Sequence, residues 1–269
     1  MVVFTNVKEK DLDILYKNGF SREEAKTIYE LVRLRNQDVT LIVYNSGKLL
    51  LQGKKEPVKR IAKKIESLGV GNLVKAEKFR QETGWVIGSD ETLKGDTFGG
   101  LVVAAVKADD NVREELLKLG VADSKSLSDK EILTLAEKIR LIAQCEIKSI
   151  LPEDYNHNGN VTQMLNKLHQ EAANYLKPGK HVVDKYPGCD VGEIQEEKAE
   201  SKYIEVAAAS ILARSAGLKQ LDYLTIKAGF SVPKGSTHVK LALMELKERR
   251  LDFNEFVKVS FRNVKEFLK

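Results

Sequence analysis

The chain has 269 residues, of which 42% are hydrophobic, 31% are charged and only two are cysteine. These figures are ordinary for a folded protein of one or two domains, and they exclude both a disordered chain and a disulfide scaffold. Apolar runs such as residues 102–106 are far shorter than the roughly 18 residues that a membrane-spanning helix needs. Because the N-terminus also lacks the order of a signal peptide, we expect a cytoplasmic protein that has no membrane partner.

Positive charge is concentrated near the N-terminus. Residues 1–80 contain 17 basic and 10 acidic side chains, a balance of +7, whereas the whole chain carries +5. Residues 51–80 alone contain nine basic and three acidic side chains. A basic cluster of this size is typical of a surface that binds a polyanion. An ordinary solvated helix face explains it equally well.

The first 75 residues predict a small α+β domain. Ser21 and Glu24 have the spacing of a capping box, which predicts a helix that runs to about Arg35. Strand-like residues 39–44 and 48–52 flank a turn that contains Gly47, which predicts a hairpin. A second helix is expected to begin near Pro57 and to end before Gly69. The polar segment 75–84 is the expected linker, so the predicted domains are residues 1–75 and 76–269.

The second domain predicts alternating strands and helices. Strands are expected at residues 85–90, 101–107, 145–151 and 181–184. Helices are expected from the capping box of Ser128 and Glu131, over residues 161–176, and from about Ser201 to Lys227. Elements of these types in this order predict an α/β domain built on a mixed sheet.

Four acidic residues follow or flank these elements in a way that suggests a metal site. Asp90 and Glu91 follow an apolar strand, Asp184 ends another, and Glu200 begins the Ala-rich helix. A charge at the end of a buried strand must be paired or hydrated, and clustered carboxylates provide the oxygen ligands that Mg²⁺ or Mn²⁺ requires. Alternation along a strand places Asp90 and Glu91 on opposite faces, so both can serve one site only if Glu91 bends out of the strand, which the glycine-containing turn beside it allows. Four separate surface carboxylates are the alternative.

The sequence resembles ribonuclease HIII, a bacterial type 2 ribonuclease H. The resemblance begins in residues 88–99, which read GSDETLKGDTFG. Further matches follow in chain order at residues 123–127, 152–156, 183–184, 198–201, 207–214 and 233–235. The N-terminal residues are similar to the TATA-box-binding-protein-like domain of that family, through their element order and the hairpin near residues 44–53.

The resemblance implies a ribonuclease H-like mixed sheet flanked by helices, preceded by the small α+β domain. It implies an endoribonuclease that cuts the RNA strand of an RNA/DNA hybrid, leaves 5′-phosphate and 3′-hydroxyl ends, and works as a monomer. It also implies that Asp90, Glu91, Asp184 and Glu200 are the catalytic, metal-binding residues, with Mg²⁺ or Mn²⁺ as the cofactor. The four histidines need no catalytic role and are expected to be surface or structural residues.

Substrate binding is implied at two further places. Lys94 and Gly95 match a Gly-Lys-Gly or Gly-Arg-Gly turn whose backbone lies close to the ribose in this family, and Ser124 and Lys125 match a segment that contacts phosphate. Leu93 replaces the first glycine of the turn. Its side chain either blocks a close approach or leaves the turn with an ordinary φ at this position.

Two other functions are open from the sequence. One is a hybrid-binding protein that has lost its catalytic activity, for which the leucine at position 93 is the only argument. The other is an unrelated enzyme on the same fold. Neither a phosphate-binding P-loop nor a dinucleotide-binding fingerprint occurs in the sequence, so this alternative has little support.

Overall fold

The structure is a computed structural model that describes residues 2–73, 79, 82–121 and 127–268. The chain forms two compact units, residues 1–76 and 77–269, and each is described by itself. The predicted linker lies mostly outside the described residues.

The first unit is a six-stranded antiparallel sheet with two helices. Its strands lie in the order β2-β3-β4-β5-β1-β6. The strands are β1 (Val2–Thr5), β2 (Ser21–Glu23), β3 (Glu30–Asn36), β4 (Val39–Tyr44), β5 (Leu49–Gln52) and β6 (Asn72–Leu73), and the helices are α1 (Glu9–Lys17) and α2 (Lys55–Ser67). Both helices pack on one core, to which α2 contributes Val58, Ile61 and Ile65. The predicted hairpin and the second predicted helix are confirmed as β4–β5 and α2.

The helix predicted from Ser21 to Arg35 is wrong, because this segment forms β2 and β3. The Ser21 hydroxyl donates to the carbonyl oxygen of Arg35 across the strand pair (3.3 Å) and caps no helix. Val32 and Leu34 point into the core while Ile28 is 86% exposed, which fits a strand better than a helical stripe. Pairing with the following strand therefore overrides a local capping signal.

The second unit is built on a five-stranded mixed sheet, as predicted. Its strands lie in the order β11-β10-β7-β8-β9, with β10 parallel to β7 and to β11, and β8 antiparallel to β7 and to β9. The strands are β7 (Val86–Thr92), β8 (Leu101–Ala108), β9 (Gln144–Ile150), β10 (Lys180–Asp184) and β11 (Ile194–Glu196).

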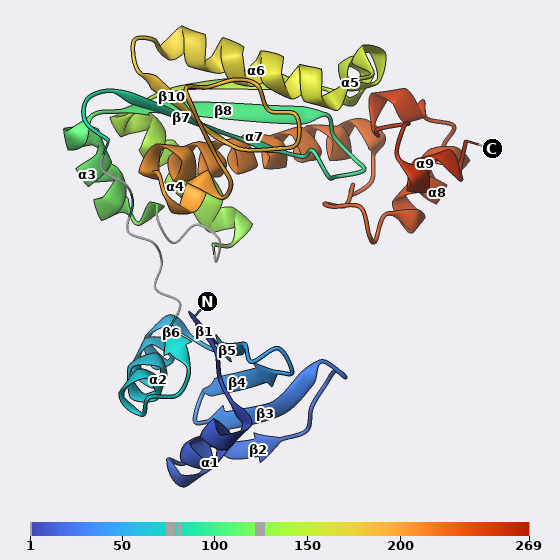
Figure 1. Cartoon of the computed structure of the whole chain (residues 1–269). Coiled ribbons are helices and arrows are strands. Elements are labelled where there is room, and N and C mark those ends of the chain that lie inside the picture. The colour runs from blue at the N-terminus through green and yellow to red at the C-terminus, as the bar shows by residue number, and fades with distance from the viewer. Residues whose placement is uncertain (1, 74–78, 80–81, 122–126, 269) are drawn as a thin grey trace. The chain divides into compact units, whose positions relative to one another are not determined.

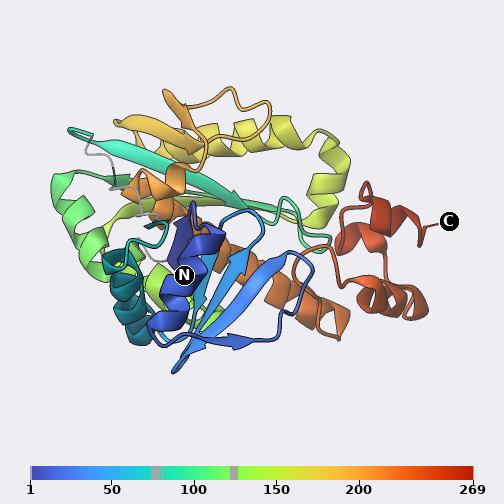
Figure 2. The same cartoon turned by 60° about the horizontal axis from the view of Figure 1, so that its bottom comes forward.

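Helices cover both faces of this sheet. The helices of this unit are α3 (Asp110–Leu119), α4 (Asp129–Ile142), α5 (Pro152–Asn158), α6 (Val161–Leu176), α7 (Ile204–Ala228), α8 (Lys240–Glu248) and α9 (Arg262–Lys265), with short 3₁₀ turns η2 (Ala199–Ser201) and η3 (Phe253–Glu255). Helices α6 and α7 lie on opposite faces (Figures 1 and 2). Among the described residues, no helix is long and apolar enough to cross a membrane.

Side chains of β8 alternate between these two faces. Ala104 and Val106 belong to the core with α4 and α7, whereas Ala105 packs with Ala172 of α6. The capping box predicted at Ser128 is present and begins α4. Helix α7 approaches the sheet so closely that a Cβ atom at Gly88 would collide with its backbone.

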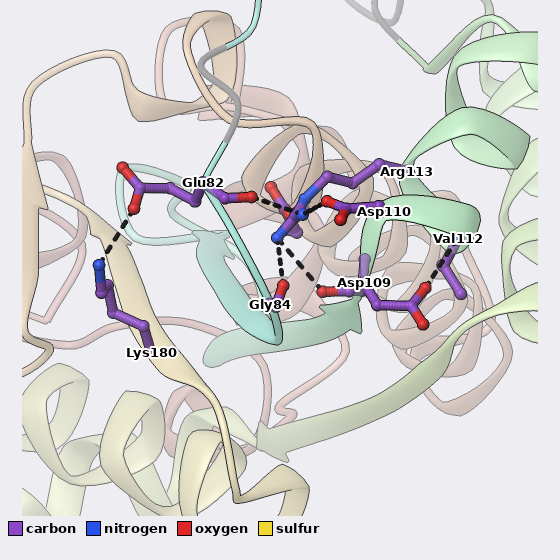
Figure 3. Close-up of polar contacts among 9 residues, drawn as sticks. Glu82, Gly84, Asp109, Asp110, Val112, Arg113 and Lys180 are labelled. Carbon is purple, nitrogen blue, oxygen red and sulfur yellow. Dashed lines mark hydrogen bonds and ion pairs between the residues drawn. The ribbon is translucent and has the colours of Figure 1, made fainter.

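A buried arginine fixes the segment just before β7 (Figure 3). The Arg113 guanidinium donates to the carbonyl oxygens of Glu82 (2.7 Å) and Gly84 (2.8 Å). It also donates to the carboxylates of Glu205 on α7 (2.5 Å) and Asp110 (2.6 Å). This contact ties the start of the central strand to α3 and α7.

Candidate active site

The two central parallel strands bring three of the predicted carboxylates to one edge of the sheet. Asp90 and Glu91 lie near the carboxyl end of β7, and Asp184 is the last residue of β10. The strands run parallel with Val183 opposite Ser89, so their carboxyl ends meet at the same edge. Open α/β sheets place their ligand sites at this edge.

Asp90 faces α7 and is 8% exposed. One of its oxygens accepts the backbone N–H of Glu91 (2.8 Å), and it also bonds the side chain of Ser210. Burial, followed by the negative charges of Glu91 and Asp184, raises the pKa of Asp90 to about 8. Asp90 therefore lies within the electrostatic field of both other carboxylates. The three alanines before Ser210 are buried, and the contact of Ser210 with Asp90 was missed from the sequence.

Glu91 stays in the strand and does not bend out of it. It is paired with Val103 of β8. Its carboxylate lies 3.1 Å from the Lys94 ammonium and 3.5 Å from Nε2 of His169 on α6. Although burial raises the pKa of Glu91, the hydrogen bonds and charges of His169 and Lys94 lower it overall. Asp90 and Glu91 thus approach the edge of the sheet from opposite faces of β7.

His169 contacts Glu91 directly, and a serine links it to a second buried histidine, His181. Ser89 Oγ lies 2.8 Å from His169 Nδ1 and 2.7 Å from His181 Nε2. All three side chains are buried, and burial lowers the pKa of His181 to about 4, helped by the charge of His169. The sequence predicted surface or structural histidines, and these two are structural. Their polar side chains in apolar elements were the signal that could have revealed the contact with Glu91.

Asp184 is joined to the turn that carries Glu200. One carboxylate oxygen of Asp184 accepts the backbone N–H of Ala199 (2.7 Å). Glu200 therefore lies in η2, one residue beyond this contact. The sequence placed Glu200 at the start of the Ala-rich helix, which is wrong, because α7 begins only at Ile204.

The turn after β7 has a glycine-like backbone at Leu93. Its φ is +65°, so of the two alternatives for this position the ordinary φ is excluded. Lys94 lies over the ring of Tyr186 (4.9 Å). Gly95 is exposed, and a Cβ atom added there would meet no atom within 4 Å. Ser124 and Lys125, the other predicted substrate contacts, lie outside the described residues.

The carboxylates fit a hard divalent cation in their donor chemistry. They supply oxygen ligands, and like charges gathered around the buried Asp90 are what a divalent cation neutralises. As the side chains stand, no three or more His, Cys, Asp or Glu residues in the described part of the chain are arranged to hold a metal ion.

Comparison with known proteins identifies the family. The family model described as ribonuclease HII matches residues 87–264. The ribonuclease HIII of Exiguobacterium sibiricum is 34% identical over 265 residues, covering 87% of this chain and 85% of that protein. The chain belongs to the ribonuclease HII family. It is therefore an endoribonuclease that hydrolyses the RNA strand of RNA/DNA hybrids and uses Mg²⁺ or Mn²⁺, which contradicts both alternative functions.

Solved structures of the same family share the fold. The crystal structure of Bst-RNase HIII in complex with Mn²⁺ has a TM-score of 0.65 and 27% identity, and the alignment covers 99% of this chain and 97% of that one. The crystal structure of Aquifex aeolicus RNase H3 has a TM-score of 0.58 and 29% identity over 97% of this chain and 100% of that one. The predicted fold class is confirmed.

Proposed function

We propose that Asp90, Glu91, Asp184 and Glu200 hold the divalent metal ions of this ribonuclease, and that cleavage leaves 5′-phosphate and 3′-hydroxyl ends. The observation that carries the proposal is the meeting of β7 and β10 at one edge of the sheet, where the charges of Asp90, Glu91 and Asp184 act on one another. Bound metal would supply activation of the attacking water and stabilisation of the departing 3′ oxygen.

The protein's own residues orient these ligands. His169 and Lys94 hold the two oxygens of Glu91. Ser210 and the Glu91 amide hold Asp90, and the Ala199 amide holds Asp184. Hydrogen bonds and charge contacts of this kind fix the direction in which a carboxylate presents its remaining lone pairs.

We test the metal-site proposal with cleavage of an end-labelled RNA/DNA hybrid in Mg²⁺ and in Mn²⁺. Asp184→Asn keeps the size of the side chain and removes its charge, so we expect at least a hundredfold loss of rate, on the order of a lost catalytic group. Asp190→Asn is the matched control, because Asp190 is exposed in the loop that follows β10. Equal activity of the two variants would refute the assignment.

We propose that the turn of Lys94 and Gly95 contacts the ribose and that Ser124 and Lys125 contact phosphate. Discrimination of RNA from DNA needs a contact with the 2′-hydroxyl. The open space at Gly95, beside the Glu91 carboxylate that Lys94 contacts, supports an approach of the sugar to the backbone there.

We propose that residues 1–75 bind the substrate and that residues 76–269 cleave it, in a cytoplasmic monomer. Lys54, Lys59, Arg60 and Lys63 are exposed on or beside α2, outside its apolar face. A surface of this kind binds phosphate through charge and releases counterions.

Changing these four basic residues to Gln in the full-length chain should weaken hybrid binding. It should also lower the slope of log affinity against log salt by up to about 0.9 for each lost phosphate contact. The control, in which two exposed basic residues are changed, is Lys118→Gln with Lys167→Gln, on helices of the second unit. An unchanged affinity and salt slope would contradict the assignment of the first unit.

A further inference from the structure

A buried lysine near the C-terminus donates all its hydrogen bonds to one turn. Lys258 is 0% exposed. Its ammonium donates to the carbonyl oxygens of Leu93 (2.8 Å), Asp96 (2.7 Å) and Gly99 (2.7 Å). An ammonium group has three N–H donors, so the turn between β7 and β8 uses the whole capacity of this side chain.

A lysine is a costly residue for this position. Its ammonium lies over the rings of Tyr155 (5.2 Å) and Phe261 (5.5 Å). Burial lowers the pKa of Lys258 to about 7, and the nearby charge of Asp96 only partly opposes this effect. An apolar residue of similar size avoids the cost of burying a charge. The lysine therefore supplies hydrogen-bond donors to the carbonyl groups of the turn, which an apolar side chain does not.

The C-terminal segment is also attached to the turn through its backbone. The Lys258 N–H donates to the carbonyl oxygen of Thr97 (3.0 Å), and the Gly99 N–H donates to that of Phe256 (3.0 Å). These bonds hold the two segments together without the ammonium. The ammonium is thus not needed merely to dock the C-terminal segment.

The residue that most needs to be held in this turn is Leu93. A left-handed backbone is strained at a residue other than glycine, and Leu93 has a φ of +65°. Its side chain is buried against Gly99 and Gly217, where added Cβ atoms would lie 2.9 Å and 3.3 Å from it. Two glycines make room for the leucine side chain, and Lys258 binds its carbonyl oxygen.

We propose that Lys258 is a positioning residue that holds Leu93 in the left-handed conformation and so gives the turn of Leu93, Lys94 and Gly95 the shape that reads the substrate ribose. The inference rests on the proposed function of this turn. It explains how the chain keeps a glycine-like turn with leucine in the place of the family's first glycine. A shift of the Leu93 backbone would move Lys94 away from Glu91, which lies 3.1 Å from it.

The test is a double-mutant cycle of Lys258→Met and Leu93→Gly in the full-length protein. The probes are an RNA/DNA hybrid and a duplex that contains one ribonucleotide. In the chain that keeps Leu93 we expect Lys258→Met to raise the KM for both by about tenfold, with kcat changed by less than about threefold. In the Leu93→Gly background the same change should raise KM by less than about threefold, because glycine adopts positive φ unaided.

The control for charge and hydrophobicity is Lys265→Met, since Lys265 is exposed on α9. An equal effect of Lys258→Met in both backgrounds overturns the proposal. Should Lys258→Met fail to fold with Leu93, folding of the double variant supports the proposal, and failure of both overturns it.

The same cycle read by thermal unfolding separates this inference from the proposed function. Coupling of the two substitutions in unfolding, without any effect on KM, means that Lys258 holds the turn but the turn does not read the ribose. Absence of coupling in both measurements means that Lys258 does not control the conformation of Leu93.

Discussion

Two buried basic side chains bind backbone carbonyl groups at the two ends of β7. They differ in whether a buried carboxylate neutralises their charge. Before the strand, Arg113 binds carbonyl groups (Figure 3). It also binds the carboxylate of Glu205, which is 1% exposed. After the strand, the ammonium of Lys258 binds three carbonyl oxygens. A paired cation can be removed only by leaving its partner unpaired, whereas removal of Lys258 leaves polar but uncharged groups. The first contact therefore serves stability, and the second serves the shape of a turn.

The largest expected effect is that of Arg113→Met. It leaves Glu205 without its buried cation, and burial already raises the pKa of Glu205 against the opposing effect of Arg113. We expect a loss of about 3–5 kcal/mol in the free energy of unfolding, measured by urea denaturation. The double variant Arg113→Met with Glu205→Leu should recover most of the loss, because it removes both charges. If Arg113→Met alone reduced the free energy of unfolding by less than about 1 kcal/mol, the contrast between a stabilising contact before β7 and a shape-determining contact after it would be wrong.

Asp90 lies between these two contacts as a buried carboxylate whose charge is unfavourable without metal. Its pKa is raised from an ordinary 3.8 to about 8, so the native state binds more protons than the unfolded state between these values. Stability in EDTA should therefore fall as pH rises from about 4 to about 8, with a contribution from this group of up to about 1.4 kcal/mol per pH unit.

The measurement is the melting temperature of the wild type and of Asp90→Asn in EDTA at pH 5, 6, 7 and 8. Asparagine does not titrate, so the variant should lose less stability with rising pH, and Mg²⁺ should stabilise the wild type most at the upper end. Asp190→Asn controls for a general effect of charge. Parallel pH profiles of the wild type and Asp90→Asn would contradict the assigned pKa shift.

Lys258→Met should cost less stability than Arg113→Met. Its carbonyl partners lose donors but no charge becomes unpaired, and the backbone bonds of Thr97 and Gly99 stay in place. We expect a loss of about 1–3 kcal/mol in the same urea series, with Lys265→Met close to the wild type. A loss as large as that of Arg113→Met would mean that the C-terminal segment unfolds with the turn.

The sequence predicts the elements of the second unit better than those of the first, for a physical reason. The capping box at Ser128 is followed by a helix because Ile132 and Ile139 share a buried face. The same signal at Ser21 is followed by strands, because pairing of Leu34 with Leu41 outweighs it. A local pattern carries no information about such pairing.

The predicted site shows the same limit: local motifs indicate its residues, but contacts between distant parts of the chain do not follow from the sequence. Motifs in the sequence indicated Asp90, Glu91 and Asp184, because residues at the ends of strands meet where parallel strands end. The contact of His169 with Glu91 and that of Lys258 with Leu93 join residues 78 and 165 positions apart in the chain. Neither contact follows from spacing. The glycine-like φ of Leu93 could not be predicted either, since it depends on that distant lysine.

The smallest expected effect concerns Lys180, whose ammonium binds the Glu82 carboxylate at 3.0 Å beside the Arg113 contact (Figure 3). Glu82 thus contributes its carbonyl group to the buried arginine and its side chain to a pair in which Lys180 is 48% exposed.

Exposed pairs contribute about 0.2–1 kcal/mol and are screened by salt. Lys180→Met should therefore reduce the free energy of unfolding by no more than about 1 kcal/mol at low salt, and by less in 1 M NaCl. Urea denaturation at both salt concentrations, with Lys265→Met as the exposed control, measures this directly. If Lys180→Met were as costly as Arg113→Met at both, the carboxylate and the carbonyl group of Glu82 would act as one unit, and the contact before β7 would extend to β10.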